Sequence, residues 1–361
     1  MRIAVTGLRG IPGVMGGVET HCEEMLPRIK RLQPDAAITV YARSPYVAGA
    51  HDHEGVAVVP VLSPRSRSFE AIVSTFNALL AARRAGAELV HIHAIGPALL
   101  VPLARILGMR VVMTHHGEDY NRAKWGFAAR QMLRLGERWG VAGADRVIAV
   151  SPSLARRLQN RFPRSKARIA YIPNGAPHLP AARGDALARF GLSHCSFILA
   201  VGRLVPEKGL HDIVEAHRRA GDGRHLVIVG GADHESSYAR ALKSAASDRI
   251  VFAGMQDRAT VRELFEHAGL FVMPSYHEGL PIAALEAASC GTPMLLSDIQ
   301  PNRDLGLSDA HYFPVGDVAA LAERLVAPAD HYVVDPADFH RRFNWDDVSR
   351  QTLDVYRAAL A

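Results

Sequence analysis

Short apolar runs rich in β-branched residues alternate with longer amphipathic stretches along most of the chain. A short apolar run is typical of a buried strand, whereas apolar residues that recur every three or four positions indicate a helix packed on one face. Regular alternation of the two predicts a parallel sheet covered by helices on both sides. In the first half of the chain, the predicted strands are residues 3–6, 37–41, 56–61, 89–93, 111–114 and 147–150.

The alternation stops once and then resumes. Residues 171–180 are rich in proline and glycine, which predicts a linker. Further strands are predicted at 197–201, 226–229, 250–252, 270–273 and 293–296, and residues 342–361 have helical spacing. The clearest helix of the first half is 18–32, whose apolar stripe is Val18, Cys22, Met25, Leu26, Ile29 and Leu32. We therefore predict an α/β protein with two similar domains, residues 1–175 and 176–341.

Composition agrees with two domains. The 361 residues are 48% hydrophobic and 22% charged, and this length exceeds that of one average domain. The three cysteines, Cys22, Cys195 and Cys290, are far apart and lack metal-like spacing, which favours buried thiols in a reducing compartment over a disulfide scaffold. Met1 leads directly into the first strand without a signal peptide, and no apolar run approaches the roughly 20 residues that span a bilayer. We expect a cytoplasmic protein.

The charge is unevenly distributed between the two halves. Residues 1–175 carry 24 Lys and Arg against 12 Asp and Glu, whereas residues 176–361 carry 18 against 24, so the first half is expected to meet an anionic partner. Its basic series 122–138 is interleaved with aromatic and aliphatic residues, which suits an anionic membrane surface, although the solvated face of a core helix has the same pattern. Nucleic acid is disfavoured because no recognised binding motif accompanies the charge. The series is Arg122, Lys124, Arg130, Arg134 and Arg138.

Two glutamates in the segment 276–290 are the most informative candidates for chemistry. Glu278 lies in a Gly/Pro turn after a predicted strand, and Glu286 follows on an apolar, helix-forming run. A rise of about 1.5 Å per residue places them roughly 10 Å apart, too far for a hydrolytic pair and suited to the two ends of one ligand. Pro281 fits the first helical turn, where free backbone amides would suit a phosphate. A nucleotide-sugar has this shape.

Glu286 lies among alanine and leucine, where an unpaired carboxylate would be costly. We predict ribose hydroxyls as its partner, with an Arg or Lys side chain as the alternative.

Ligands of open α/β sheets bind beyond the carboxyl ends of the strands. The first predicted strand runs into the glycine-rich segment 7–17, whose spacing is not the G-x-G-x-x-G of dinucleotide binding, so an NAD site is disfavoured. Because strand-to-helix links usually need about two to six residues, this longer segment indicates a flexible loop that approaches a phosphate or an acceptor, rather than a plain connection.

Four histidines fall at two adjacent strand ends, namely His91, His93, His115 and His116. Side chains alternate along a strand, so His115 and His116 should face opposite sides. His116, which precedes Gly117, is the predicted ligand contact.

The strand 197–201 leads into a turn that holds two cations, Arg203 and Lys208, with Gly202 before them. Two such cations could neutralise a diphosphate without a metal ion, and a surface ion pair with Glu207 is the alternative. Gly230, after the next strand, could let backbone approach a base.

Together, the spacing of Glu278 and Glu286, the Gly202-Arg203 pair with Lys208, the glycine loop and the run 173–175 resemble a retaining glycosyltransferase of family 4, of the glycosyl transferases group 1. The resemblance implies the GT-B fold, with two Rossmann-like, doubly wound parallel-sheet domains that face each other across a cleft. Segments 11–20 and 117–126 are also similar to bacterial polysaccharide-assembly enzymes, which include rhamnosyltransferases.

The family resemblance implies a role for each candidate. Glu278 would bind hydroxyls of the donor sugar and His116 would contact that sugar near the reacting carbon. The C-terminal helix, about 342–361, would pack back on the first domain. Arg203 and Lys208 would neutralise the leaving diphosphate, Glu286 would hold the ribose, the amides of Gly279 and Leu280 would approach the phosphates, Gly16 and Gly17 would line the acceptor side near the β-phosphate, and Gly202 and Gly230 would complete the donor site.

The function implied is retaining, metal-independent transfer from a nucleotide-diphosphate sugar to a glycan or lipid-linked acceptor in cell-surface polysaccharide biosynthesis. No Asp-x-Asp metal motif is present and no cofactor is expected. The protein would lie in the cytoplasm, in peripheral contact with the inner face of an anionic membrane. A nucleotide-sugar 2-epimerase of the same fold, or a binding protein with a degenerate site, are the alternatives. The nucleotide, the sugar, the acceptor and the linkage are not predicted.

Overall fold

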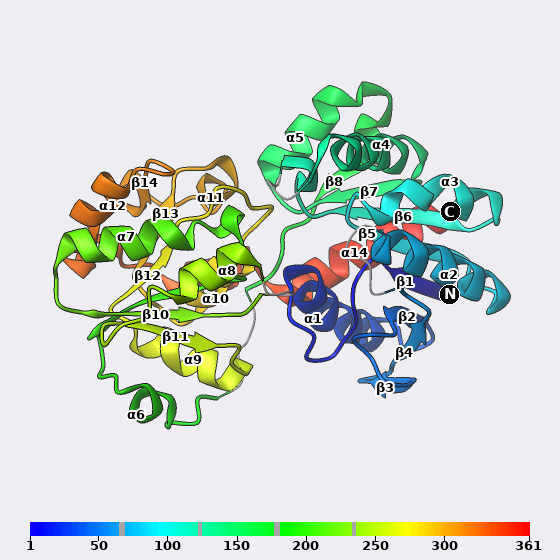
Figure 1. Ribbon diagram of the computed structural model, residues 1–361. Helices are drawn as coiled ribbons and strands as arrows, with labels where there is room; N and C mark the ends of the chain where they lie inside the picture. Colours follow the sequence, from blue (N-terminus) through cyan, green and yellow to red (C-terminus); the bar gives the residue numbers. More distant parts are fainter. Residues whose placement is uncertain (65–68, 122–124, 177–180, 233–235) are drawn as a thin grey trace. The chain divides into compact units, whose positions relative to one another are not determined.

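The computed structural model describes residues 1–361 except 65–68, 122–124, 177–180 and 233–235. The chain forms two compact units, Met1–Gly175 with Asn344–Ala361, and Ala176–Phe343 (Figure 1). The first crossing falls after residue 175, where we placed it, and the return falls after residue 343, two residues later than the expected 341. Arg122 and Lys124 of the predicted basic series, and residues 177–180 of the linker, lie outside the described residues.

The N-terminal unit contains an eight-stranded sheet of order β3-β4-β2-β1-β5-β6-β7-β8. All neighbouring strands are parallel except β3 and β4. The order reverses between β1 and β5, so this is the switch point at which ligands of such sheets bind. The strands are β1 (Arg2–Thr6), β2 (Ala37–Arg43), β3 (His51–His53), β4 (Val56–Val61), β5 (Leu89–His93), β6 (Arg110–His115), β7 (Arg146–Ala149) and β8 (Ile169–Tyr171), of which β3 and β8 were not predicted.

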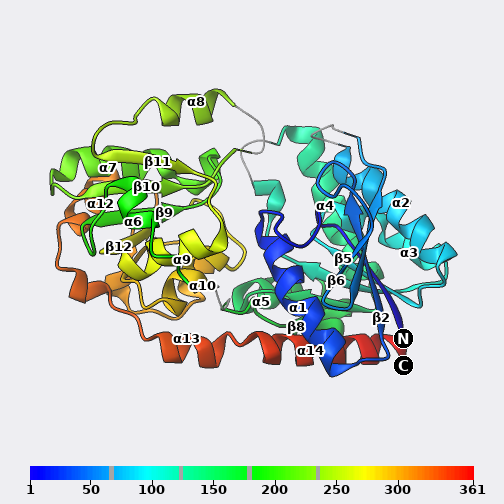
Figure 2. The ribbon, with the colours of Figure 1, turned by 90° about the horizontal axis from the view of Figure 1, so that it is seen from below.

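The predicted stripe of the first helix packs against the last helix of the chain. On α1 (Gly17–Leu32), Cys22, Met25 and Ile29 are fully buried in one core with Tyr356 of α14 (Trp345–Leu360). Figure 2 shows α14 alongside α1. The expected return of the C-terminal helix to the first domain is therefore seen. The other helices of this unit are α2 (Glu70–Arg84), α3 (Val101–Ile106), α4 (Phe127–Gly143) and α5 (Pro152–Arg161), with short 3-10 turns at Pro97–Leu100, Asp119–Asn121 and Pro163–Arg168.

The C-terminal unit contains a six-stranded, fully parallel sheet of order β11-β10-β9-β12-β13-β14. Its switch point lies between β9 and β12. The strands are β9 (Phe197–Val201), β10 (His225–Val229), β11 (Ile250–Gly254), β12 (Leu270–Met273), β13 (Met294–Ser297) and β14 (Tyr312–Phe313), of which β14 was not predicted. The helices are α6 (Ala186–Phe190), α7 (Leu210–Ala220), α8 (Ser237–Lys243), α9 (Arg258–His267), α10 (Ile282–Ser289), α11 (Gln300–Arg303), α12 (Val318–Leu325) and α13 (Pro336–Arg342), with 3-10 turns at Pro206–Lys208, Asp309–His311 and Ala329–Tyr332.

Two local expectations were wrong. Only Cys22 is a buried thiol, because Cys195 is exposed in a turn and Cys290 is half-buried at the end of α10. Pro281 does not lie in the first helical turn. It has an extended conformation and caps α10, which begins at Ile282.

Candidate active site

The loops after β9 and β12 meet at the switch point of the second sheet. The amide of Tyr276 donates to the carbonyl oxygen of Glu207 at 2.9 Å. A side chain at Gly209, whose φ is +63°, would collide with the backbone of Pro274. This close packing places Lys208 against Glu278, and Nζ of Lys208 donates to Oε1 of Glu278 at 2.5 Å. Two residues selected from the sequence for different parts of a ligand thus form one ion pair.

The Lys208–Glu278 pair is largely shielded from water. The Glu278 side chain is 10% exposed and that of Lys208 is 22% exposed. Burial opposes ionisation of Glu278, but the charge and hydrogen bond of Lys208 outweigh it and lower the pKa of this carboxyl below its ordinary value. Glu278 is therefore a carboxylate at neutral pH. The alternative of a surface pair between Lys208 and Glu207 is wrong, because Glu207 is buried and its carboxylate accepts no hydrogen bond from a described residue.

Two glycines let the neighbouring strand ends approach. Gly230 has a φ of +139°, and a side chain there would collide with the carbonyl oxygen of Gly202. The amide of Gly202 donates to Val229 at 2.9 Å. Half-exposed Arg203 lies in the same turn as Lys208. The structure therefore places the predicted cations and both glycines at one sheet edge.

The other predicted donor residues lie just before α10 or on it. Gly279 is half-buried and Leu280 is buried, just before the helix, and Glu286 lies half-buried on the second turn. Their contacts to phosphate and ribose remain predictions.

In the N-terminal unit, the glycine loop after β1 is fastened to α1 by two acids. The amide of Arg9 donates to buried Glu19, and the amide of Gly13 donates to Glu23, both at 2.9 Å. The expectation of a flexible loop that offers its amides is therefore wrong for these two amides. Gly16 caps α1 with a φ of +152°, where a side chain would collide with Glu19, and Gly17 begins the helix. Glu19 was missed, although its place in the first turn of a helix could have marked it as a partner for loop amides.

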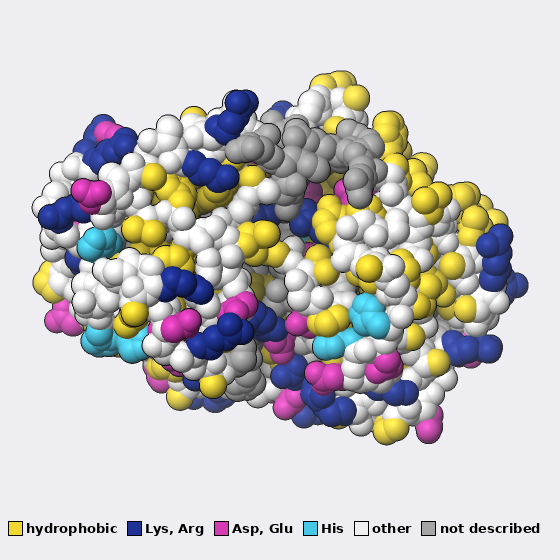
Figure 3. Space-filling view, turned by 60° about the horizontal axis from the view of Figure 1, so that its bottom comes forward, with side chains coloured by type: hydrophobic (Ala, Val, Ile, Leu, Met, Phe, Trp, Pro, Cys, Tyr) yellow, Lys and Arg dark blue, Asp and Glu magenta, His cyan; other side chains and the backbone are white. Residues whose placement is uncertain are grey.

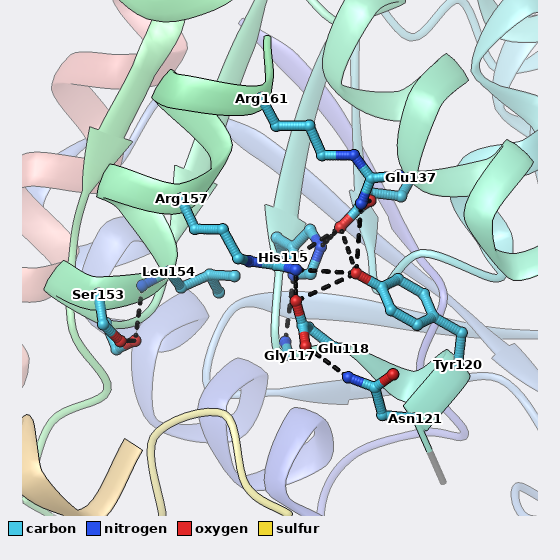
Figure 4. Close-up of polar contacts among 11 residues, drawn as sticks. His115, Gly117, Glu118, Tyr120, Asn121, Glu137, Ser153, Leu154, Arg157 and Arg161 are labelled. Atoms are coloured by element: carbon cyan, nitrogen blue, oxygen red, sulfur yellow. Dashed lines mark hydrogen bonds and ion pairs between the residues drawn. The ribbon is translucent and has the colours of Figure 1, made fainter. Parts of the chain in front are cut away.

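His115 and His116 face different surroundings, as alternation predicts. Nε2 of His115 donates to Oε1 of Glu137 at 3.0 Å, and both side chains are fully buried. Figure 4 shows that Arg157 and Arg161 of α5 and the hydroxyl of Tyr120 converge on the same carboxylate, at 2.7–3.3 Å. His115 is therefore bound within a structural network, which leaves His116 as the candidate ligand contact.

His116 belongs to a cluster of histidines at the switch point of the first sheet. Its Nε2 lies 3.0 Å from Nδ1 of His93, at the end of β5. His21 of α1 completes the group, with ring centroids 5.1 Å from His116 and 5.6 Å from His93, and donates from Nδ1 to Oδ1 of Asn174 at 3.0 Å. His21 was missed, although it is three residues after Val18 and four before Met25 on the buried stripe.

His91 contacts the cluster, with its ring centroid 4.0 Å from that of His93, and is held by two hydroxyls. Its Nδ1 and Nε2 each lie 2.7 Å from a hydroxyl oxygen, of Tyr356 and Thr114 respectively. This histidine is therefore structural, like His115.

Burial keeps the clustered rings neutral. It lowers the pKa of His21 from 6.5 to about 4, despite the hydrogen bond from its ring to Asn174. Burial, reinforced by the neighbouring imidazoles, holds the pKa of His91, His93 and His116 well below the usual range.

Comparison with known proteins identifies the family of the chain. The family described as Glycosyltransferase Family 4 matches residues 15–178, and Glycosyl transferases group 1 matches residues 194–326. The chain is 30% identical to 2-deoxystreptamine N-acetyl-D-glucosaminyltransferase from Streptomyces fradiae, over 76% of this chain and 71% of that protein. The chain belongs to glycosyltransferase family 4.

Other relatives of this family 4 glycosyltransferase span its whole length. It is 29% identical to alpha-maltose-1-phosphate synthase from Mycobacterium tuberculosis, over 100% of both chains. Among solved structures, sucrose-phosphate synthase from Thermosynechococcus elongatus superposes with a TM-score of 0.81 at 22% identity, covering 99% and 98% of the two chains. HepE from Anabaena, solved with UDP-glucose, has a TM-score of 0.77 at 16% identity, covering 99% and 100%. The fold is GT-B, and the protein is an enzyme that transfers sugar from a nucleotide-sugar.

We expect this glycosyltransferase to lose stability as the pH falls from 6.5 to about 4. An unfolded histidine binds its proton near pH 6.5 and folded His21 only near pH 4, so the unfolded chain holds more protons in this window. Each such histidine should lower the free energy of unfolding by up to about 1.4 kcal/mol per pH unit. Thermal midpoints measured between pH 6.5 and about 4 test this prediction. His21→Asn, which keeps a donor for Asn174, should show a shallower slope, and equal slopes would contradict the assignment.

Proposed function

We propose that this enzyme transfers a sugar from a nucleotide-diphosphate sugar to a glycan or lipid-linked acceptor, with retention of configuration and without a metal ion. The observation that carries the proposal is the Lys208–Glu278 pair at the switch point of the second sheet. A bound diphosphate offers Lys208 a stronger anionic partner, and the carboxylate of Glu278 then becomes available to accept hydrogen bonds from sugar hydroxyls.

Charge stabilisation is the main chemistry that these residues supply. The bond between the anomeric carbon and the phosphate oxygen breaks as the acceptor oxygen bonds to that carbon from the same face. The departing phosphate takes the acceptor proton, and the products are the glycoside and a nucleoside diphosphate. Lys208 and Arg203 would neutralise the charge that develops on the leaving group, which is the task that a metal ion has in other enzymes. His116 stays a prediction as the sugar contact.

Donor binding and turnover test the proposal together. UDP-glucose, GDP- and dTDP-sugars should be screened by thermal shift, because a ligand at about 100 times its dissociation constant stabilises a protein by about 2.7 kcal/mol. The donor that binds should then release nucleoside diphosphate only when an acceptor is present, and EDTA should not slow the reaction. Epimerisation without acceptor would favour a 2-epimerase, and no shift with any donor would contradict the proposal.

The acceptor side is proposed to lie at an anionic membrane surface in the assembly of cell-surface polysaccharide, with the enzyme in the cytoplasm. The solvent-facing side of α4 combines Phe127, 78% exposed, and Trp139, 41% exposed, with Arg130, Arg134 and Arg138. Figure 3 shows apolar side chains gathered along the margin of the N-terminal unit with basic ones beside them. None of the described helices is long and apolar enough to cross a membrane.

Changing Arg130, Arg134 and Arg138 to Gln should weaken binding to anionic phospholipid vesicles by roughly 100-fold. Each basic residue near such a surface contributes about 1 kcal/mol, so three contribute about 3 kcal/mol. Co-sedimentation at low salt measures it. The matched control changes Arg218, Arg240 and Lys243 of the C-terminal unit to Gln, which removes the same charge. Equal loss in both variants, or no binding by the unaltered protein, would contradict a membrane role for α4.

A further inference from the structure

Three histidines of the N-terminal unit present their ring nitrogens to one point. Among the described residues, His21, His93 and His116 form the one group of three whose potential ligand atoms all lie within 4.8 Å of one another. They come from α1, from the end of β5 and from the residue after β6, so three packed elements fix their positions. Their ring centroids are 5.1–5.6 Å apart, which is a nearly equilateral triangle.

The spacing fits a small, imidazole-preferring cation. Zinc–nitrogen bonds of about 2.0–2.1 Å at tetrahedral angles set the ligand nitrogens about 3.4 Å apart. His93 and His116 are at 3.0 Å, and the whole group is within 4.8 Å, so side-chain shifts of about 1 Å would complete the geometry. Three imidazoles suit zinc, copper, nickel or cobalt, whereas Mg²⁺ and Ca²⁺ require oxygen ligands.

Hydrogen bonds around the group leave its inward nitrogens available once a single proton moves. Nδ1 of His93 and Nε2 of His116 share one hydrogen bond at 3.0 Å, so one of these two nitrogens carries a proton, which must pass to the outer nitrogen of its ring when a metal ion binds. Nδ1 of His21 donates to the amide oxygen of Asn174, so its Nε2 carries a lone pair. Nε2 of His93 lies 3.5 Å from the sulfur of Cys22, which leaves Nδ1 of His93 facing His116. Ligating histidines in metal sites are held by such outer partners.

The group is also in the protonation state that metal binding needs. Burial holds the pKa of His21 at about 4 and that of His93 and His116 well below the usual range, so protons do not compete at neutral pH. The Cys22 sulfur contacts Nε2 of His93, which is the ring nitrogen opposite the one that faces His116, so it is an outer partner of the group.

We propose that His21, His93 and His116 form a binding site for a late first-row transition-metal ion, Zn²⁺ being the best fit, and that an ion bound there inhibits sugar transfer. Three protein ligands leave a fourth position open to water. Inhibition follows because coordination takes Nε2 of His116 away from the donor sugar, and this part alone rests on the proposed function. None of the three histidines is a residue that would neutralise the leaving group, so a metal ion bound to them is compatible with metal-independent transfer.

Cobalt titration of the full-length, EDTA-treated and desalted protein tests the site directly. We expect one Co²⁺ per chain with the visible absorption of a low-coordinate nitrogen site, and its displacement by Zn²⁺. His21→Asn should weaken binding at least about 100-fold, and Asn174→Ala, which removes only the outer partner, about 10-fold. Cu²⁺ should quench Trp345, whose ring lies 5.5 Å from that of His21, in the unaltered protein and not in His21→Asn.

A second pair of histidines, of which His194 is exposed and His267 is half-buried, provides the matched control. His194 and His267 of the C-terminal unit place their Nδ1 atoms 3.0 Å apart beside Cys195. The double change of His194 and His267 to Asn should leave the cobalt spectrum and affinity unchanged. Circular dichroism and the thermal midpoint establish that His21→Asn is folded. Zn²⁺ should raise the midpoint of the unaltered protein and of the control variant, but not that of His21→Asn.

Three results would overturn the metal site: no cobalt spectrum, equal affinity of the unaltered protein and His21→Asn, or loss of the spectrum in the control. The histidines would then form a hydrogen-bonded chain of neutral rings only. Transfer should fall at least tenfold on saturation with Zn²⁺, and much less in His21→Asn. Binding without inhibition would overturn the inhibitory role and count against His116 as the sugar contact, while the metal site would stand.

Discussion

Lys208→Ala is expected to lower kcat/KM by about 10²–10³. The change removes a preorganised cation from the developing charge of the leaving group, and such groups contribute about 2.7–4 kcal/mol to the transition state. It also leaves the nearly buried Glu278 without the ammonium that lowers its pKa. The pKa of Glu278 should then rise, so the acid limb of the pH–rate profile should shift to higher pH. Steady-state kinetics with donor and acceptor between pH 4 and 8 measures both effects.

Two further variants make this result specific. Lys243→Ala removes an exposed lysine from α8 of the same unit and should change kcat/KM less than threefold. Glu278→Ala should also abolish most turnover. The loss of transition-state stabilisation in the double variant should be smaller than the sum of the losses in the two single variants, because each single change leaves one charged partner unpaired. If Lys208→Ala kept full activity, the donor site would have to be placed elsewhere.

Glu137→Ala should lower the free energy of unfolding by about 3 kcal/mol. This carboxylate is fully buried and balances Arg157 and Arg161, so its removal leaves two guanidinium groups and His115 without their common acceptor. Removing one partner of a buried ion pair typically costs 3–5 kcal/mol, and the lower end applies because both arginines are partly exposed. Urea denaturation measures the loss of free energy of unfolding, and the thermal midpoint provides a second measurement.

Glu54 offers the surface counterpart in the same unit. It pairs with Arg31 at 3.0 Å, but the two side chains are 58% and 59% exposed. Glu54→Ala should therefore cost at most about 1 kcal/mol. Similar losses for Glu54→Ala and Glu137→Ala would contradict the view that the buried network of Figure 4 stabilises the N-terminal unit more than a surface ion pair does.

The sequence predicted the sheets well where a strand is a mostly apolar run. Strands β4, β5, β9 and β12 have the predicted bounds. Strands β9 and β12 are apolar throughout and almost wholly buried, whereas β5 includes two buried histidines and three residues of β4 are half-buried. Strands β3, β8 and β14 were missed because they have only two or three residues, and β3 reads His-Asp-His. Such edge strands depend on their neighbours, which local patterns do not record.

The candidate residues were easier to predict than their partners. Glycines and cations at strand ends locate the switch points, since parallel strands bring all their carboxyl ends to one edge. The pairing of Lys208 with Glu278 depends on two loops 70 positions apart. His21 is harder still, because a histidine within an apolar helical stripe becomes a candidate only when His93 and His116 are seen beside it.

The place of α14 in the first core has a consequence for biosynthesis. The second unit is one uninterrupted segment, Ala176–Phe343, whereas the first is built from both ends of the chain. As the chain leaves the ribosome, the second unit has all its residues while α1 still lacks Val348, Leu353 and Tyr356, which cover its apolar side. The N-terminal unit, whose synthesis begins first, is thus the last to receive all its residues. A chain that ends near residue 343 would expose the apolar face of α1 that α14 covers.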